Sequence, residues 1–203
     1  MSKQIVTAGQ GVFPWGVDPR NRILVDSTRS VVSAGQELVA GAPLAMDGTA
    51  TAANVGKLKT VAEAGDLFYG LSSTNLNTLY GTVSLGEWNS VRANAELQGI
   101  YTVRQSVFLD AAGDEVTVNP FEEKVWGGAT ADYPTTTDIG ALLHAKLVTD
   151  ALLPGGPHLK WTPASGATGA GFRNVAVIVD VRTEEVDIML PNVLASYDAD
   201  ISS

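Results

Sequence analysis

The C-terminal stretch FRNVAVIVDVRTEEVDIML has the most regular pattern in the chain, and its period is two residues. Valines recur at every second position from Val175 to Val181, whereas Asp180 and Arg182 fall on the opposite parity. The alternation resumes beyond the polar Thr183–Glu184 pair. Because successive side chains of a strand point to opposite faces of its sheet, this pattern predicts a β-hairpin. All four valines would share one face, and the other face would be wet at the tip of the hairpin.

Turn signals divide the rest of the chain into short apolar runs. The chain has 21 Gly and 9 Pro among 203 residues, and both residue types favour turns over long helices. The Asp47-Gly48 pair predicts a tight hairpin turn, since both residues tolerate the positive φ that such a turn needs. The stretch LDAAGDEVTV predicts strand, turn and strand, and DLFYGLSS predicts a further short strand. We therefore predict a mainly β fold, a compact antiparallel β barrel or sandwich of short strands.

Two later segments are less regular. In TTTDIGALLHAKLVTDALLPGG, Asp138 could cap a short helix that runs to about Leu147. Gly140 and its β-branched neighbours equally allow a strand, so both alternatives stay open. The following stretch, PGGPHLKWTPASGATGAG, is rich in glycine and proline and predicts a turn-rich excursion before the final hairpin.

The N-terminal region differs from the rest of the chain. Residues 1–28 are rich in glycine, proline and polar residues, so we interpret them as an extended N-terminal arm. Residues 29–203 would form the barrel or sandwich domain, and this length suffices for a hydrophobic core. Within the arm, GQGVFPWGVDPRNR places Phe13 and Trp15 on either side of Pro14. A proline interrupts any ordinary central strand.

The arm is not expected to hold itself in place. Docking each aromatic ring is worth roughly 3 kcal/mol, whereas ordering a dozen residues costs on the order of 1 to 2 kcal/mol each. The arm therefore needs backbone hydrogen bonds from a neighbouring surface, either its own domain or another subunit. We hypothesise that another subunit supplies them. The partner-binding residues would be Val12, Phe13, Pro14, Trp15, Val17, Arg20 and Arg22.

The acidic composition excludes some partners. The chain has 13 Lys and Arg against 22 Asp and Glu, a formal net charge of -9. Nucleic-acid binding needs clustered basic residues that neutralise phosphates, and the basic residues here are scattered, so we expect no direct contact with nucleic acid or with a membrane. No cysteine occurs, which excludes disulfides and thiolate metal sites. The first residues lack the apolar run of a signal peptide, so we expect synthesis in a cytoplasm.

No group of residues predicts a catalytic, cofactor or metal site. His144 and His158 lie in different segments without the spacing of a metalloprotease motif, and we expect ordinary surface or turn histidines. The stretch GATGAG (166–171) lacks the order of a phosphate-binding motif and predicts a flexible loop. Asp110 and Asp114 lack the alternating ligands of a calcium-binding EF-hand loop and are expected in a solvated hairpin turn. An enzyme is therefore the least supported class.

The remaining aromatic and acidic residues fit structural roles. Trp88, Trp126 and Trp161 lie in or beside apolar runs and are expected in the core or just beneath the surface. The pairs Glu122–Glu123 and Glu184–Glu185 are expected on exposed turns or edges, where their charge discourages stray strand pairing.

The stretch AGQELVAGAPLAMDGTATAANVG, followed by AGDLFYGLSS, resembles the head decoration (cement) proteins of tailed bacteriophages. The resemblance consists of a strand entering G-x-x-L-x-x-G-x-P-L, a turn, a polar Thr/Ala segment, and then G-D-x-x-x-G-x. It continues in GTVSLGEWNSVRANAELQGIYTV, YPTTTDIGALLHAKLVTD and NVAVIVDVRTEEVDIMLP, and so covers most of residues 30–191.

The resemblance implies a compact β domain on the outer surface of an icosahedral capsid. Its implied partners are the major capsid protein and further copies of this chain, as a homotrimer or another small oligomer. In the family an N-terminal arm often reaches onto the capsid and gains a strand by β-augmentation, which would explain the aromatic residues of the arm. Residues 119–138 and the loop around Gly155–Gly171 would be insertions. The protein would be made in the host cytoplasm and act in the virion.

Two other interpretations stay open. Another virion component, such as a tail tube or the base of a head fibre, would share the β texture and an interacting arm. A carbohydrate-binding β module would need solvent-facing aromatic residues on one face of the domain.

Overall fold

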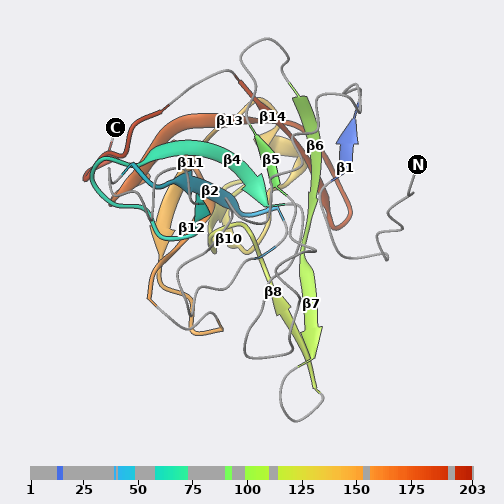
Figure 1. The fold of residues 1–203 in the computed structure, drawn as a ribbon. Coiled ribbons are helices and arrows are strands. Elements are labelled where there is room, and N and C mark those ends of the chain that lie inside the picture. The colour runs from blue at the N-terminus through green and yellow to red at the C-terminus, as the bar shows by residue number, and fades with distance from the viewer. Residues whose placement is uncertain are drawn as a thin grey trace.

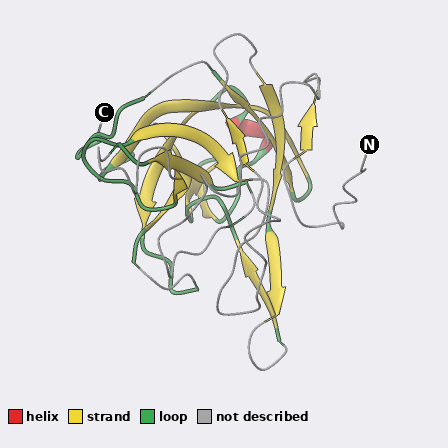
Figure 2. Cartoon of the chain, in the orientation of Figure 1, coloured by secondary structure: helices red, strands yellow, loops and turns green. Residues whose placement is uncertain are grey.

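The computed structural model describes residues 13–15, 39, 41–48, 58–72, 90–92, 99–109, 114–152, 156–191 and 195–202. Over these residues the chain is mainly β, which confirms the predicted class. Figure 2 shows strands joined by loops, with one short 3₁₀ turn, η3 (Thr136–Asp138), as the helical element of this part. None of the residues that the structure describes belongs to a helix long and apolar enough to cross a membrane.

The strands form two larger antiparallel sheets and two short hairpins (Figure 1). In chain order they are β1 (Phe13–Trp15), β2 (Pro43–Met46), β3 (Leu58–Lys59), β4 (Leu67–Ser72), β5 (Ser90–Arg92), β6 (Gly99–Arg104), β7 (Ser106–Leu109), β8 (Glu115–Val118), β9 (Lys124–Trp126), β10 (Ala129–Ala131), β11 (Leu142–Val148), β12 (His158–Pro163), β13 (Gly171–Arg182) and β14 (Glu185–Leu190). One sheet has the order β1-β6-β14-β13-β11-β12, and the other has the order β3-β2-β4-β5.

Several elements predicted from local sequence are confirmed. The two strands predicted around LDAAGDEVTV correspond to β7 and β8, which pair antiparallel and project away from the two sheets in Figure 1. The predicted turn, residues 110–113, lies outside the described residues. The stretch DLFYGLSS contains β4, and the C-terminal hairpin is β13–β14. Each of these elements is specified by its own sequence.

The barrel alternative is wrong, because both larger sheets are open over the described residues. In the six-stranded sheet the edges are β1 and β12, which do not pair with each other. Other segments occupy the outer edge of β12: Leu159 N donates to Thr60 O at 2.7 Å, and Trp161 N donates to Pro120 O at 2.9 Å. A strand that closed the sheet would need these same backbone groups.

The two larger sheets share one hydrophobic core. Phe68 of β4 packs against Trp161 of β12 and Phe172 of β13, with ring centroids 6.2 and 5.9 Å apart. Trp126 and Trp161 are both almost fully buried, which confirms the expectation for these two residues. Trp88 lies outside the described part of the chain.

The segment 119–138 contributes directly to this core. Phe121 and Trp126 are 1% exposed, and their rings meet edge to face with centroids 5.9 Å apart. The Trp126 indole N–H donates to the carbonyl of Glu122 at 3.0 Å. The domain therefore depends on this segment for packing.

The faces of the C-terminal hairpin differ from the prediction. Along β14 the pairing advances by one residue, from Ile188 to Asp187, while along β13 it advances by two, from Ile178 to Asp180. Val179 is the extra residue of this β-bulge, and a bulge shifts the alternation of its strand by one position. Val181, beyond the bulge, is consequently buried, whereas Val179 before it is 36% exposed. The prediction that the four valines share one face is wrong.

The Asp47-Gly48 pair does not form the predicted tight turn. The strands β2 and β3 pair, with Ala45 opposite Lys59, but residues 47–57 separate them along the chain. A Cβ atom on Gly48 would lie 1.8 Å from the carbonyl oxygen of Gly65. Glycine is needed at position 48 because two backbone segments approach closely there.

The segment from Asp138 to Leu147, for which a helix and a strand were both open, forms a strand over most of its length. The turn η3 is held by the Asp138 carboxylate, which accepts hydrogen bonds from the backbone N–H groups of Thr135 at 2.7 Å and Gly127 at 3.0 Å. The chain then turns at Gly140, where φ is +89°, and enters β11. Since β11 pairs with β12 on one side and β13 on the other, two backbone ladders override any local tendency to form a helix.

The predicted turn-rich excursion contains a central structural element, so that prediction is wrong. All six residues of β12 are buried. Leu159 and Trp161 face the shared core, while Lys160 lies between them on the opposite parity. Glycine- and proline-rich flanks conceal this short alternation in the sequence.

Residues 195–202 connect the two larger sheets, and we call them the C-terminal strap. One antiparallel bridge pairs Ser196 with Leu67 of β4. A second antiparallel bridge pairs Asp198 with Gly171 of β13. A single extended segment therefore forms backbone hydrogen bonds with both sheets.

Candidate interaction surface

The N-terminal arm enters the described structure as one short strand. β1 pairs with β6 of the same chain, with Phe13 opposite Thr102, Pro14 opposite Tyr101 and Trp15 opposite Ile100. The domain itself therefore offers the backbone pairing that the arm needs. Binding of a partner by the arm stays a prediction.

The rest of the arm prediction falls on residues that the structure does not describe. These include the boundary between residues 28 and 29. The other proposed partner-binding residues in this group are Val12, Val17, Arg20 and Arg22.

Next to β1, the strands β6, β14 and β13 present a face that points away from the core. Their core side carries alternating apolar residues such as Val186 and Ile188. Their antiparallel register aligns the residues of the opposite parity in cross-strand rows. We call this side the outer face. Its rows are Ile100–Met189–Val177, Thr102–Asp187–Asp180 and Arg104–Glu185–Arg182.

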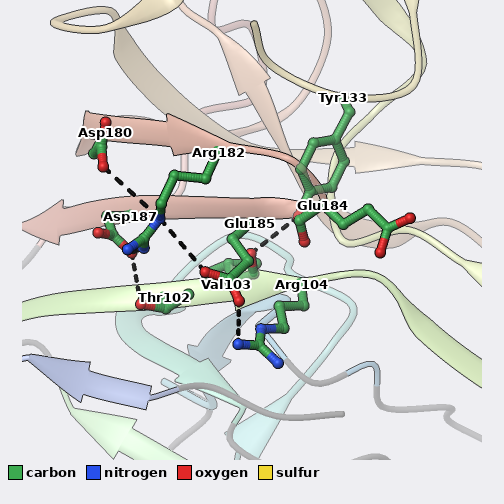
Figure 3. Close-up of polar contacts among 9 residues, drawn as sticks. All are labelled: Thr102, Val103, Arg104, Tyr133, Asp180, Arg182, Glu184, Glu185 and Asp187. Atoms are coloured by element: carbon green, nitrogen blue, oxygen red, sulfur yellow. Dashed lines mark hydrogen bonds and ion pairs between the residues drawn. The ribbon is translucent and has the colours of Figure 1, made fainter. Parts of the chain in front are cut away.

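Arg182 is the centre of the ion pairs on the outer face (Figure 3). Its Nη2 atom lies 2.6 Å from Oδ1 of Asp187. Its Nε atom lies 3.4 Å from Glu185 Oε2 and 3.8 Å from Asp180 Oδ2. Arg182 and Asp180 are 39% and 48% exposed, so solvent screening leaves each exposed pair worth about 0 to 1 kcal/mol. Their main effect is to fix the orientation of the guanidinium group.

Two side-chain contacts connect β6 to β14. Thr102 Oγ1 donates to Asp187 Oδ1 at 2.6 Å, and Arg104 forms an ion pair with Glu185. Asp187 therefore accepts hydrogen bonds from β6 through Thr102 and from β13 through Arg182. These contacts reinforce the backbone pairing of the three strands.

Tyr133 braces the tip of the hairpin against β6. Its hydroxyl lies 3.0 Å from the carbonyl oxygen of Val103 and 3.1 Å from that of Glu184 (Figure 3). Its single proton can be donated to one of these carbonyls at a time. Burial, followed by the charge of Glu185, raises the pKa of the Tyr133 hydroxyl, so the group stays a donor throughout the neutral range. Glu184 occupies the exposed turn at the tip, as predicted, with φ at +61°.

The first row of the outer face is apolar and extends beyond three strands. Val177 is paired with Leu142 of β11, and at the other end Ile100 is paired with Trp15 of β1. Leu142 is 45% exposed, and Ile100, Met189 and Val177 are partly exposed. The sequence predicted a wet face only at the tip of the hairpin. The apolar row from Leu142 through Val177 and Met189 to Ile100 becomes visible only when the register is known.

Both histidines are buried inside strands, so the expectation of surface or turn histidines is wrong. His144 in β11 is 3% exposed, and its Nδ1 atom accepts a hydrogen bond from the backbone N–H of Asn174 at 2.8 Å. His158 in β12 is 2% exposed, and its Nδ1 atom lies 3.1 Å from Thr60 Oγ1. Hydrogen bonds satisfy these ring nitrogens and allow their burial.

A histidine, a threonine hydroxyl and an aspartate lie near one another around His158, and these residue types also occur at nucleophilic catalytic sites. Asp150 lies near this histidine and is ion-paired with Lys160. Burial opposes the charge of Asp150, but hydrogen bonds from Lys160 and from the backbone of Leu152 lower its pKa overall. The adjacent cavity has a volume of about 10 Å³, enough for one water molecule. Thr60 and His158 are each 2% exposed, and the contact between them ties β12 to the segment that follows β3.

A second buried cluster surrounds Lys59 of β3. The Lys59 ammonium lies 2.7 Å from Glu63, 3.2 Å from Asp66 and 3.5 Å from Asp47. Burial opposes the charge, but hydrogen bonds with Glu63 and Asp66, together with the nearby carboxylate charges, raise the pKa of Lys59. Asp66 also accepts the backbone N–H of Gly48 at 3.0 Å. A lysine held as a cation is no nucleophile, so the cluster fixes the connections between β2, β3 and β4.

Glu122 is not on an exposed turn, which corrects the prediction for one member of its pair. Its side chain is 13% exposed and forms an ion pair with Lys146 of β11 at 2.6 Å. Its neighbour Glu123 is exposed, as predicted.

The described part of the chain contains no group of three or more His, Asp or Glu side chains arranged to hold a metal ion. Asp110, considered for calcium in the sequence, lies outside the residues that the structure describes.

Comparison of the chain with known proteins gives no match among family models, curated proteins or solved structures.

Proposed function

We propose that this protein is a structural virion protein that decorates the outer surface of a tailed-phage capsid and stabilises it by bridging neighbouring major capsid proteins. The observation that carries the proposal is the position of β1. A three-residue strand from the chain end is added at the edge of a sheet, where it pairs with β6. That pairing lies within one chain. In the proposed function the arm would form the same kind of edge pairing with a neighbouring molecule, which is β-augmentation. The sequence resemblance to phage decoration proteins supports the same assignment.

Pro14, in the middle of the edge strand β1, is consistent with an arm that adds one strand to a sheet and ends it there. Proline lacks a backbone N–H, so it is tolerated at sheet edges and hinders the addition of another strand. In the proposed function the arm pairs with a neighbouring subunit, while the domain remains a β-sandwich of the two larger sheets. The arm residues Phe13 and Trp15 would then lie between neighbours.

Bridging needs no strong single contact. Packed DNA pushes the shell outward, and a protein that spans adjoining subunits resists their separation. Many modest contacts repeated over a closed lattice act together through effective concentration. The formal net charge of -9 also disfavours adhesion to the packaged nucleic acid, which suits a position outside the shell.

The test is to remove the protein from purified particles and to measure the temperature at which they release DNA. Stripped particles are expected to release DNA at a lower temperature, and adding the purified protein back is expected to restore the original value. Equal heat resistance with and without the protein would contradict the proposal. Electron microscopy of labelled protein would find it on heads, whereas label confined to tails would assign it to another part of the virion.

A further inference from the structure

We infer that the outer face of β6, β14 and β13, together with the beginning of β11, is the docking face of this protein. It fits a protein partner whose contact surface is apolar at the centre and basic along one border. The inference rests on the proposed function, in which that partner is the subunit of the shell, and it names the surface that the decorating protein uses.

Exposed apolar side chains gather at one end of this face. Four large hydrophobic residues are exposed in the described part of the chain, and three of them are Ile139, Leu142 and Val179, at 47%, 45% and 36%. Their backbones are adjacent, because Gly140 N donates to Ile178 O at 2.8 Å and Ile178 N donates to Ala141 O at 3.0 Å. The fourth, Leu152, follows β11 in a separate turn.

The fold builds this exposure with specific backbone features. The bulge in β13 leaves two consecutive residues, Val179 and Asp180, on the outer side between the buried residues Ile178 and Val181. Bulges redirect side chains and are over-represented near functional sites. Gly140, with φ at +89°, makes the turn that brings Ile139 and Leu142 beside β13. An apolar patch made by such features favours an interaction surface over incidental exposure.

The charges beside the apolar row define the partner. Two arginines, Arg104 and Arg182, lie among four carboxylates, of which Asp187 is buried and the other three reach the surface, so the border carries a net negative charge. The carboxylates belong to Asp180, Glu184, Glu185 and Asp187. A second copy of a chain with a net charge of -9 would bring acidic residues against acidic residues, which is costly. A partner with basic residues on its rim is complementary.

The outer face is continuous with the arm. The apolar row runs from Leu142 through Val177, Met189 and Ile100 to the Cα partner Trp15 of β1. β1 therefore lies at the border of this face, and a neighbour that paired with β6 in its place would reach the same border. The arm and the face would contact one partner at the same time, and their binding free energies would reinforce each other.

Side-chain contacts prepare the face for binding. The ion pairs of Arg182 and the Tyr133 hydroxyl fix the tip of the β13–β14 hairpin relative to β6 (Figure 3). A surface that is already ordered loses less conformational entropy when it binds.

The experiment measures binding of purified variants to capsids stripped of the protein. Leu142→Asp and Val179→Asp place a carboxylate in the apolar row and are expected to weaken binding about tenfold or more. Leu152→Asp is the matched control, since Leu152 is 40% exposed away from the face, and it is expected to bind as the wild type does. Asp180→Lys is expected to weaken binding, unlike the control Glu123→Lys at another exposed site. Melting temperatures of all variants establish that they fold.

The outcomes separate the two claims. If the wild-type protein does not bind stripped capsids, the proposed function fails. If the wild type binds and the Leu142 and Val179 variants bind equally well, the function stands and the docking face is wrong. If the wild type self-associates in sedimentation and Leu142→Asp abolishes that association, the partner of this face is a second copy, and the inference of a basic partner is overturned.

Discussion

The two ends of the described chain are held in different ways. β1 is three residues long and pairs with one strand, β6, at the edge of one sheet. The C-terminal strap pairs with β4 in one sheet and with β13 in the other. It also buries Ile201 completely, and its Arg173 partner bonds both Asp198 and the backbone of Asp200.

The strap is therefore tied to both sheets, whereas β1 is paired with a single strand at a sheet edge. Removing the strap would expose buried apolar surface and leave backbone groups of two sheets without their partners. Releasing β1 would break one short ladder at a sheet edge, and the same ladder could form with another chain. We infer that the strap maintains the domain, while the arm is the end available for assembly.

The largest expected effect is at the buried residue of the strap. Ile201→Ala removes a side chain with 0% exposure and is expected to lower the free energy of unfolding by about 2 to 5 kcal/mol. Denaturant titration measures this change. Ala199→Ser, at an exposed position of the same strap, is the control and is expected to change stability by less than about 0.5 kcal/mol. Equal stability of both variants would show that the strap does not contribute to the core.

The next effect is at the strand that receives the strap. Gly171 exchanges two backbone hydrogen bonds with Asp198, at 2.8 and 2.9 Å. A Cβ atom on Gly171 would lie 2.1 Å from the carbonyl oxygen of Ala145. Gly171→Ala is therefore expected to cost about 1 to 3 kcal/mol through overpacking, measured by thermal unfolding. Gly166→Ala meets no neighbouring atom within 4 Å, so its cost is the strain of placing alanine at φ +72°. Gly171→Ala adds overpacking and should cost more, so an equal or smaller loss at Gly171 would contradict the packing argument.

The smallest effect is the pH dependence of the strap. A hydrogen bond from the Asp200 backbone, and then one from Arg173, lowers the pKa of Asp198 below the ordinary value of 3.8. A carboxyl group with a lowered pKa in the folded state stabilises that state above its unfolded pKa, and this contribution is lost as the pH falls through the folded pKa. The protection factors of the strap amides, which correct for the pH dependence of the chemical exchange rate, are therefore expected to fall below about pH 4. Asp198→Asn should weaken that pH dependence. If protection of the strap is independent of pH in both the wild type and the Asp198→Asn variant, the proposed role of Asp198 is contradicted.

The elements predicted correctly from the sequence are those whose structure depends on residues close to them along the chain. The β7–β8 and β13–β14 hairpins follow from a local period and local turns. The strand β12 was missed, because its short alternation is flanked by glycine and proline and its stability comes from β11 and the segment near Phe121. The bulge at Val179 was also missed, since nothing in a regular alternation of valines marks the position of the extra residue.

For the candidate surface, too, local features were predicted and features that join distant parts of the chain were not. The wet tip of the hairpin was visible in the sequence, because Asp180 and Arg182 lie on the parity opposite to the valines. The apolar row was not, because it joins residues from distant parts of the chain, from Ile100 to Leu142 and Val177. Burial of His144 could not be predicted either, since it depends on a hydrogen bond from Asn174, thirty residues away.

The most direct test of the central claim is deletion of residues 1–28. The truncated protein is expected to keep a melting temperature close to that of the full chain, because β1 contributes one short edge ladder. When added to stripped capsids, the full chain is expected to restore resistance to heat-induced DNA release, whereas the truncated protein is not. Restoration by the truncated protein to the level of the full chain would contradict the account.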